Sequence, residues 1–318
     1  MPVIAYQSFN ANASYAHDLS GMSRQNLTIQ TNKRIIERGD RALVMPLVDG
    51  NTVTAVEGPA ELVKVAPLTD PHTIELFGAQ ISLVWQTLYR SFGKMPDIMA
   101  CGELDASHAD FKTLIIDPAV TVKPTPSAKA CQSFTTFSQT RLSSAIEFLT
   151  SGEGFVAYRV GRLTVLFVHV PNKWAGKQGE AQKFYRAIGN LPELLARPIH
   201  LVIGDTNQKS QGFTAEALNA AFNATGYVNA HLGLVSNADN YMVTERGTNS
   251  VGTKMFDVVV YRADLARLVA PVVYYSQSSG AVTVTDHGGL CVEIEVNKRA
   301  REDSSDPSPP AKRIKVSP

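Results

Sequence analysis

The stretch Ile199-His-Leu-Val-Ile-Gly-Asp-Thr-Asn207 contains an apolar run that changes abruptly to polar residues. The run at residues 199–203 is typical of a strand that is buried on both faces. Asp205 and Asn207 follow it two positions apart, and in an extended segment such residues point the same way, so both side chains could face one cleft. Because Gly, Asp and Asn also build ordinary turns, a simple turn remains an alternative interpretation.

Three other segments place polar residues at the end of an apolar run. These are Phe167-Val-His169-Val-Pro171, Thr285-Asp-His287-Gly-Gly289 and Met95-Pro-Asp-Ile-Met-Ala-Cys-Gly-Glu103. Each also has a simpler interpretation: His169 as a packed core histidine, Asp286 and His287 as part of an exposed glycine-rich turn, and Glu103 as a solvated loop residue. Asp105 is a second candidate beside Glu103.

Taken in their order along the chain, these segments resemble the signature of the endonuclease/exonuclease/phosphatase superfamily, the fold of pancreatic-type deoxyribonuclease. The resemblance implies an α/β fold, a four-layer sandwich of two mixed β-sheets flanked by helices. It covers residues 1–296, with an insertion near residues 20–71. The chain departs from the family where Cys-Gly-Glu replaces Leu-Gln-Glu, where Thr206 replaces Phe, where Thr285 replaces Ser, and where Gly288-Gly289 replaces a region in which Pro is common.

The resemblance also implies metal-assisted hydrolysis of a phosphate ester, with Mg²⁺ or Mn²⁺ as the cofactor, since hard oxygen ligands suit these ions. The metal shell would contain Glu103, Asp286 and Asn10, with Gln7 as a competitor of Asn10. His169 would donate a hydrogen bond to the scissile phosphate, Asp205 would position or activate the water, and Asn207 would bind phosphate. His287 would be the general base, oriented by Asp257.

Residue periodicity predicts the remaining elements, although strands and helices alternate without a regular βαβ rhythm. We expect helices at residues 74–92, 138–149, 179–196 (with a break near Gly189 and Pro192) and 214–224. We expect strands at residues 2–6, 97–101, 111–116, 154–159, 163–170, 199–203, 256–261, 282–284 and 290–296, and a hairpin within residues 42–56 that turns at Asp49-Gly50-Asn51.

Charge is distributed unevenly along the chain. The net charge is +1, but residues 297–318 carry six Lys or Arg against three Asp or Glu, so the remainder has 24 basic and 26 acidic residues and a charge of −2. A groove for a polyanion on residues 1–296 must therefore be a local patch. The last 22 residues have no periodicity and contain four prolines, so a disordered tail is predicted.

That tail resembles a bipartite nuclear localisation signal, formed by Lys298, Arg299, Lys312, Arg313 and Lys315. The partner implied is a nuclear import receptor. A solvated basic tail, or one that holds nucleic acid without specificity, is the alternative.

Other sequence features limit the possible function classes. The three cysteines, Cys101, Cys131 and Cys291, are widely spaced and suggest neither a disulfide framework nor a zinc site. Cys101 and Cys291 lie in apolar runs and are expected to be buried thiols. No secretory signal is visible at the start of the chain, and no apolar run approaches the roughly 20 residues that span a bilayer.

Three function hypotheses follow. The first is a metal-dependent DNA endonuclease that acts in a nucleus. In the form of a toxin or effector it would act in a host nucleus, comparable in its logic to nuclear-acting genotoxins of the cytolethal distending toxin type. Its partners would be DNA and the import receptor, and it would act as a monomer or within a delivered complex. The second is a phosphatase for phosphoinositides or another phosphoester, and the third is a catalytically degenerate nuclear binding protein.

Overall fold

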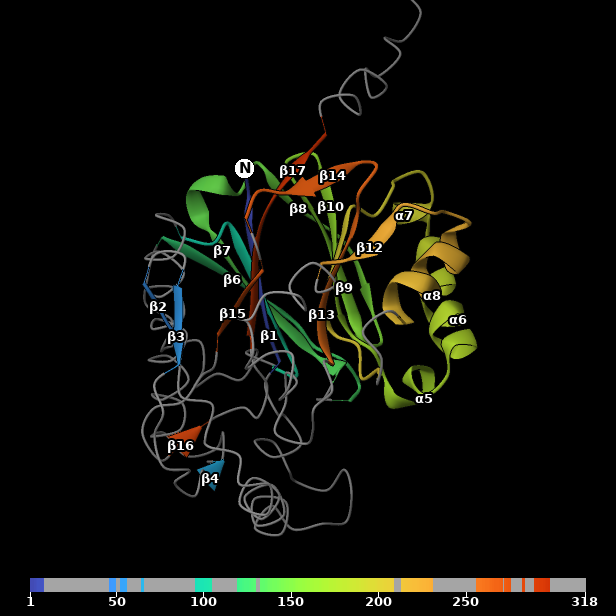
Figure 1. The fold of residues 1–318 in the computed structure, drawn as a ribbon, viewed down its shortest axis with the longest axis horizontal. Helices are drawn as coiled ribbons and strands as arrows, with labels where there is room; N and C mark the ends of the chain where they lie inside the picture. The colour runs from blue at the N-terminus through green and yellow to red at the C-terminus, as the bar shows by residue number, and fades with distance from the viewer. Residues whose placement is uncertain are drawn as a thin grey trace, which may run out of the picture.

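Two β-sheets pack face to face, and a layer of helices covers the outer face of one of them (Figure 1). The computed structural model describes residues 1–8, 46–49, 52–55, 64–65, 95–104, 119–129, 132–208, 213–230, 256–270, 272–275, 282–283 and 289–297. The α/β architecture of two mixed sheets with flanking helices confirms the fold class predicted from the sequence.

The first sheet has seven strands in the order β14-β17-β1-β5-β7-β6, with β15 also paired to β17. Only β1 and β5 are parallel to each other, and every other pair is antiparallel. The strands are β1 (Val3–Ser8), β5 (Ile98–Gly102), β6 (Val120–Thr125), β7 (Phe134–Gln139), β14 (Ala266–Leu268), β15 (Val273–Tyr275) and β17 (Gly289–Val296).

The second sheet has six strands in the order β12-β13-β11-β10-β9-β8. Here β10 and β11 form the parallel pair, and the other pairs are antiparallel. The strands are β8 (Ile146–Gly152), β9 (Phe155–Val160), β10 (Leu163–His169), β11 (Leu201–Asp205), β12 (Tyr227–Asn229) and β13 (Asp257–Arg262). Contacts of β1 with β11 and of β5 with β10 bring the two parallel pairs together across the sandwich.

Two apolar layers hold these elements together. The layer between the sheets includes Ile4, Tyr6, Phe134 and Phe167, which are almost completely buried. Full burial of a side chain of this size contributes about 1.5–3 kcal/mol. The layer between the second sheet and the helices comprises residues from the opposite faces of β9, β10, β11 and β13 together with apolar residues of the helices. Residues 201–205 of β11 are therefore buried on both faces, as predicted.

The helical layer consists of α5 (Asn172–Ala175), α6 (Gln178–Gly189), α7 (Pro192–Leu195) and α8 (Phe213–Phe222). Helix α6 buries Ala181, Phe184, Tyr185 and Ile188, a three-to-four-residue spacing that presents one apolar stripe to the sheet. The predicted break near Gly189 and Pro192 is confirmed, because α6 ends at Gly189 and α7 begins at Pro192. No helix among the described residues is both long and apolar enough to span a bilayer.

One predicted helix, at residues 138–149, is wrong. These residues form the end of β7, a short 3-10 helix η2 (Thr140–Leu142) and the first half of β8. Strand β8 pairs with β9, and Ile146 and Phe148 pack against the layer between the sheets. Two apolar residues two positions apart are the strand period, and pairing with β9 overrides the helical spacing.

The remaining predictions have mixed outcomes. Strands β1, β5, β9, β10, β11, β13, β16 (Val282–Thr283) and β17 confirm eight of the nine predicted strands, and β2 (Pro46–Asp49) and β3 (Thr52–Ala55) confirm the hairpin. Strand β4 (Lys64–Val65) pairs in parallel with β16 (Val282–Thr283). Cys101 and Cys291 are both buried, as expected. The helix at 74–92, the strand at 111–116, Cys131, most of the insertion and the basic tail lie outside the described residues.

Candidate active site

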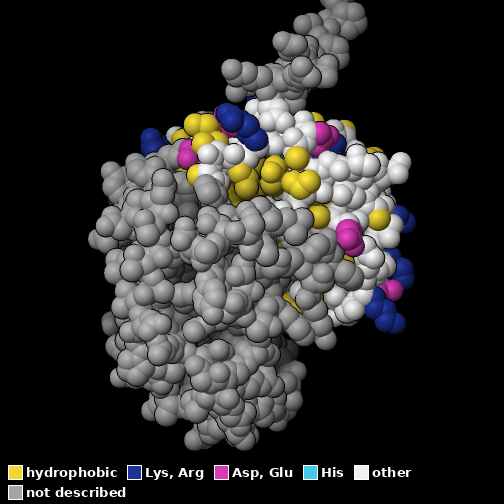
Figure 2. Space-filling view, in the orientation of Figure 1, with side chains coloured by type: hydrophobic (Ala, Val, Ile, Leu, Met, Phe, Trp, Pro, Cys, Tyr) yellow, Lys and Arg dark blue, Asp and Glu magenta, His cyan; other side chains and the backbone are white. Residues whose placement is uncertain are grey.

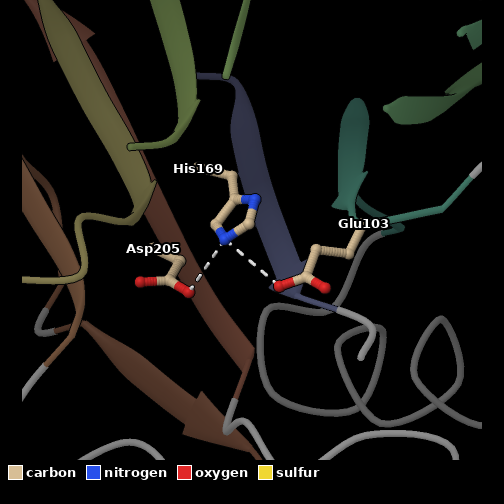
Figure 3. A group of neighbouring side chains, drawn as sticks. All are labelled: Glu103, His169 and Asp205. Atoms are coloured by element: carbon tan, nitrogen blue, oxygen red, sulfur yellow. Dashed lines mark ion pairs between the residues drawn. The ribbon is translucent and has the colours of Figure 1, made fainter. Parts of the chain in front are cut away.

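Three polar side chains from separate strands converge at one end of the sandwich (Figure 3). Nε2 of His169 lies 3.1 Å from Oε1 of Glu103 and 3.6 Å from Oδ2 of Asp205. One ligand atom from each residue lies within 4.8 Å of the other two. The residues are only 7%, 7% and 1% exposed for Glu103, His169 and Asp205, so the cluster is enclosed by the protein.

Strand pairing explains why these residues meet. Strands β10 and β11 run parallel with His169 opposite Asp205, so both side chains emerge at the carboxyl ends of neighbouring strands. Glu103 comes from the other sheet, one residue beyond β5, and β5 contacts β10 across the sandwich. The site therefore requires both sheets, and neither sheet supplies it alone.

Glu103 has an unusual backbone conformation. Its φ is 56°, in the left-handed region that residues other than glycine and asparagine seldom adopt. Such a conformation costs on the order of 1–3 kcal/mol and persists only where the surrounding structure enforces it. A buried, strained glutamate beside a histidine and a second carboxylate is difficult to explain by packing, and it favours a role for the carboxylate in binding.

Asp205 and Asn207 form a tight turn at the end of β11. The Asn207 backbone N–H donates to Oδ1 of Asp205 at 2.8 Å, and the Asn207 side-chain amide donates to the Val170 carbonyl at 2.9 Å. Asn207 has a φ of 52°, which asparagine tolerates. Strand alternation does not orient this pair, because β11 ends at Asp205. The turn and the site coexist: Oδ1 closes the turn while Oδ2 faces His169.

Asp257 lies beside Asp205 on the neighbouring strand. It begins β13, is its register partner, and is fully buried. Thr206 joins the two strands beyond this point, because its N–H and hydroxyl both donate to the Phe256 carbonyl, at 2.7 and 2.9 Å. Asp257 is thus part of the wall of the site, and the predicted orientation of His287 by Asp257 stays a prediction.

Tyr6 is a component of the site that the sequence analysis missed. It is fully buried, and a Cβ on Gly102 would overlap its hydroxyl. This contact explains why residue 102 is a glycine. Burial, together with the charges of Asp205 and Asp257, raises the pKa of Tyr6 well above its usual value, so the phenol keeps its proton. The glycine itself was the available signal, since it departs from the family pattern at a strand end.

A second missed feature is a buried polar pair beneath the turn. The Thr214 hydroxyl donates to Oε1 of Gln208 at 2.7 Å, and both residues are 0% exposed. Gln208 follows Asn207 directly, and Thr214 lies in the first turn of α8. The pair therefore ties the chain after the site to the start of α8. A polar residue directly after Asn207 gave no distinctive signal, because loops commonly contain such residues.

Replacing Thr214 by valine should lower the free energy of unfolding by about 1–3 kcal/mol, because Oε1 of Gln208 would lose its donor in a buried position. The double variant Thr214→Val/Gln208→Leu should recover most of that loss, since it removes both polar partners. Urea unfolding measures both effects. Thr121→Val is the control: its hydroxyl makes an exposed bond to Thr140. A Thr214→Val protein as stable as Thr121→Val would contradict the role of this pair.

Other predicted site residues lie outside the described part of the chain. These are Asn10, Asp286 and His287, together with Asp105. Gln7, the competitor of Asn10, is buried in β1, and its Nε2 donates to the Ser8 carbonyl at 2.8 Å. Strand β17 begins at Gly289 and runs antiparallel to β1, so the chain after the Thr285–Gly289 motif enters the sheet near the end of β1 where Gln7 lies.

The donor set fits a divalent cation. Two carboxylates and an imidazole on three backbone elements can approach one ion from different sides, and carboxylate oxygens suit Mg²⁺ and Mn²⁺. Among the described residues, Glu103 is placed to hold such an ion, with Asp205 and His169 within reach of the same position.

Comparisons with known proteins return similar solved structures of low sequence identity. No family model matches the chain, and no curated protein matches it. Solved structures of endonuclease/exonuclease/phosphatase proteins resemble it in fold.

TDP2 of D. rerio, complexed with a single-stranded DNA product, is 16% identical over 72% of this chain and 94% of its own, with a TM-score of 0.45. An endonuclease/exonuclease/phosphatase family protein of Bacteroides thetaiotaomicron is 12% identical over 71% and 92%, with a TM-score of 0.42. The 3′ phosphatase NExo from Neisseria, bound to a product DNA hairpin, is 12% identical over 68% and 95%, with a TM-score of 0.43.

Proposed function

We propose that the protein is a metal-dependent phosphodiesterase whose substrate is DNA. The observation that carries this proposal is the convergence of Glu103, His169 and Asp205 at the carboxyl ends of β5, β10 and β11. Two nearly buried carboxylates this close repel each other unless a cation or proton lies between them. Such a site is suited to hydrolysis of a phosphate ester, where charge develops on non-bridging oxygens.

Each candidate residue would have a separate role in hydrolysis of the phosphate ester. Glu103 would hold Mg²⁺ or Mn²⁺, with Asp286 and Asn10 as the proposed additional ligands; a bound divalent ion neutralises charge on the phosphate. Asp205 would position the attacking water, and His287, oriented by Asp257, would take its proton. His169 and Asn207 would donate hydrogen bonds to the phosphate oxygens.

We also propose that the tail directs the protein to a nucleus, which could be that of a host cell if the chain is a toxin or effector. The support is the basic sequence itself, Lys298-Arg299 followed by Lys312-Arg313-Ile-Lys315. An import receptor would bind this segment through acidic pockets. Loss of nuclear accumulation of a fluorescent fusion on changing Lys312 and Arg313 to alanine would support the assignment, and unchanged accumulation would overturn it.

A phosphatase for phosphoinositides or another phosphoester is the second candidate. The charge of −2 on residues 1–296 favours it, because a general nucleic-acid binder is basic overall. A catalytically degenerate binding protein is the third, and it predicts no metal-dependent turnover.

Plasmid nicking tests the proposed function. Supercoiled plasmid should be nicked with Mg²⁺ or Mn²⁺, and nicking should stop with EDTA and in Glu103→Gln. Glu193→Gln, an exposed acidic residue of α7, is the matched control and should nick at the wild-type rate. Phosphate release from phosphoinositides, measured in parallel, separates the second candidate. Folded protein that leaves the plasmid intact would overturn the DNA substrate.

A further inference from the structure

A small cluster of charged side chains lies beside the candidate active site. Glu153 is in the turn between β8 and β9, and the next residue, Gly154, accepts a hydrogen bond at 2.9 Å through its carbonyl from the backbone N–H of His169. Lys173 lies in α5, four residues after His169. Glu153 and Lys173 are therefore carried by backbone next to His169, and together with Lys129, which lies after β6, they form a cluster that we call the rim.

Two lysines share the one carboxylate of the rim. Nζ of Lys173 donates to both carboxylate oxygens of Glu153, at 2.9 and 2.8 Å, and Nζ of Lys129 lies 3.9 Å from Oε1. The side chains of Lys129, Lys173 and Glu153 are 59%, 52% and 42% exposed. The hydrogen bond from Lys173 lowers the pKa of Glu153, which therefore stays ionised. The rim carries a net positive charge that is open to solvent.

The rim is poorly suited to a structural role. Exposed ion pairs contribute little to stability, because each side chain can pair equally well with water and salt. Displacement of the Glu153 carboxylate from the two lysines by another anion would therefore cost little free energy. Phosphate oxygens can take the place of the carboxylate oxygens, since lysine binds phosphate as a mobile point charge.

The neighbouring surface adds further positive charge. Lys177, at the start of α6, is exposed, and the nearest acidic residue of that helix, Glu180, is already paired with Lys183 at 2.8 Å. Figure 2 shows Lys and Arg side chains, with acidic ones between them, along the edge occupied by α5 and α6. A local patch of this kind is what a chain with a net charge of −2 over residues 1–296 needs to hold a polyanion.

We propose that Lys129 and Lys173 contact the nucleic-acid backbone at phosphates next to the scissile one, and that Glu153 is a built-in competitor for those lysines. This inference rests on the proposed function and narrows its substrate to a chain of phosphates that extends beyond the site. A single small phosphodiester would occupy the cluster of Glu103, His169 and Asp205 without reaching the rim.

Binding of a fluorescein-labelled single-stranded oligonucleotide, followed by anisotropy in EDTA over a series of NaCl concentrations, tests the proposal. Glu153→Gln should bind about 3–10-fold more tightly, and Lys173→Met should bind more weakly. For Lys173→Met, the logarithm of the association constant should also fall less steeply with log[NaCl]. The magnitude of the slope should decrease by about 0.7, which corresponds to the loss of one phosphate contact on a single strand. Glu147→Gln is the matched control, because it breaks a similarly exposed pair between Glu147 of β8 and Arg159 of β9. Its affinity should remain that of the wild type.

Hydrolysis of bis(4-nitrophenyl) phosphate separates failure of this inference from failure of the proposed function. All three variants should hydrolyse this small diester at the wild-type rate. Wild-type DNA affinity and slope in both Glu153→Gln and Lys173→Met, with plasmid nicking intact, would overturn the rim and leave the function standing. Wild-type protein that hydrolyses the small diester but neither binds nor cleaves DNA would overturn both the DNA substrate and the rim.

Discussion

Asp205→Asn should reduce DNA hydrolysis by about 10²–10³-fold while leaving the protein folded. Several kcal/mol of transition-state stabilisation depend on charge at such a site, and each 1.36 kcal/mol is a factor of ten in rate. Asparagine keeps the oxygen that accepts the Asn207 backbone N–H, so the turn at the end of β11 should persist. The variant loses only the negative charge that faces Nε2 of His169.

Two measurements on Asp205→Asn distinguish lost chemistry from lost structure. Initial rates of plasmid nicking at saturating Mn²⁺ report the chemistry, and thermal unfolding without metal reports the fold. Because removal of one of two nearby carboxylates relieves their repulsion, the midpoint temperature of unfolding should be unchanged or higher than that of the wild type. Asp264→Asn is the control: Asp264 forms an exposed pair with Arg262 beyond the other end of β13. Nicking by Asp205→Asn within tenfold of the wild type would contradict the assigned role.

Gly204→Ala should lower the free energy of unfolding by more than about 3 kcal/mol. Gly204 has a φ of 147°, and a Cβ there would overlap the Val168 carbonyl oxygen and lie 2.9 Å from the Val168 nitrogen. Val168 is its register partner in the parallel pairing of β10 and β11. A methyl group would therefore push apart the two strands that carry His169 and Asp205, and activity should fall with stability.

Gly161→Ala is the matched control for this prediction. Gly161 also has a positive φ, 59°, but nothing lies within 4 Å of the position its Cβ would take. The free energy of unfolding of this variant should fall only by the cost of placing a residue with a Cβ in the left-handed conformation, about 1–2 kcal/mol. Urea unfolding of both variants separates conformational strain from the clash with β10. Equal losses in the two proteins would show that the contact with Val168 is unimportant.

Local sequence was sufficient for the elements whose patterning is strong. The apolar run before Asp205 predicted a strand buried on both faces, and the spacing along residues 179–196 predicted α6 and its end near Gly189. It was insufficient for residues 138–149, where helical spacing competes with a strand and only pairing with β9 decides. Propensity is a weak guide when the partner strand lies in another part of the chain.

The candidate site likewise depends partly on local sequence and partly on long-range contacts. The sequence by itself placed Glu103, His169 and Asp205 at strand ends, because each follows an apolar run whose burial is a local property. Only the tertiary structure decided that they meet, since the parallel pairing of β10 with β11 and the packing of β5 across the sandwich are long-range contacts. The same holds for Tyr6 against Gly102 and for Lys129 beside Glu153: no sequence period encodes distances between residues that far apart.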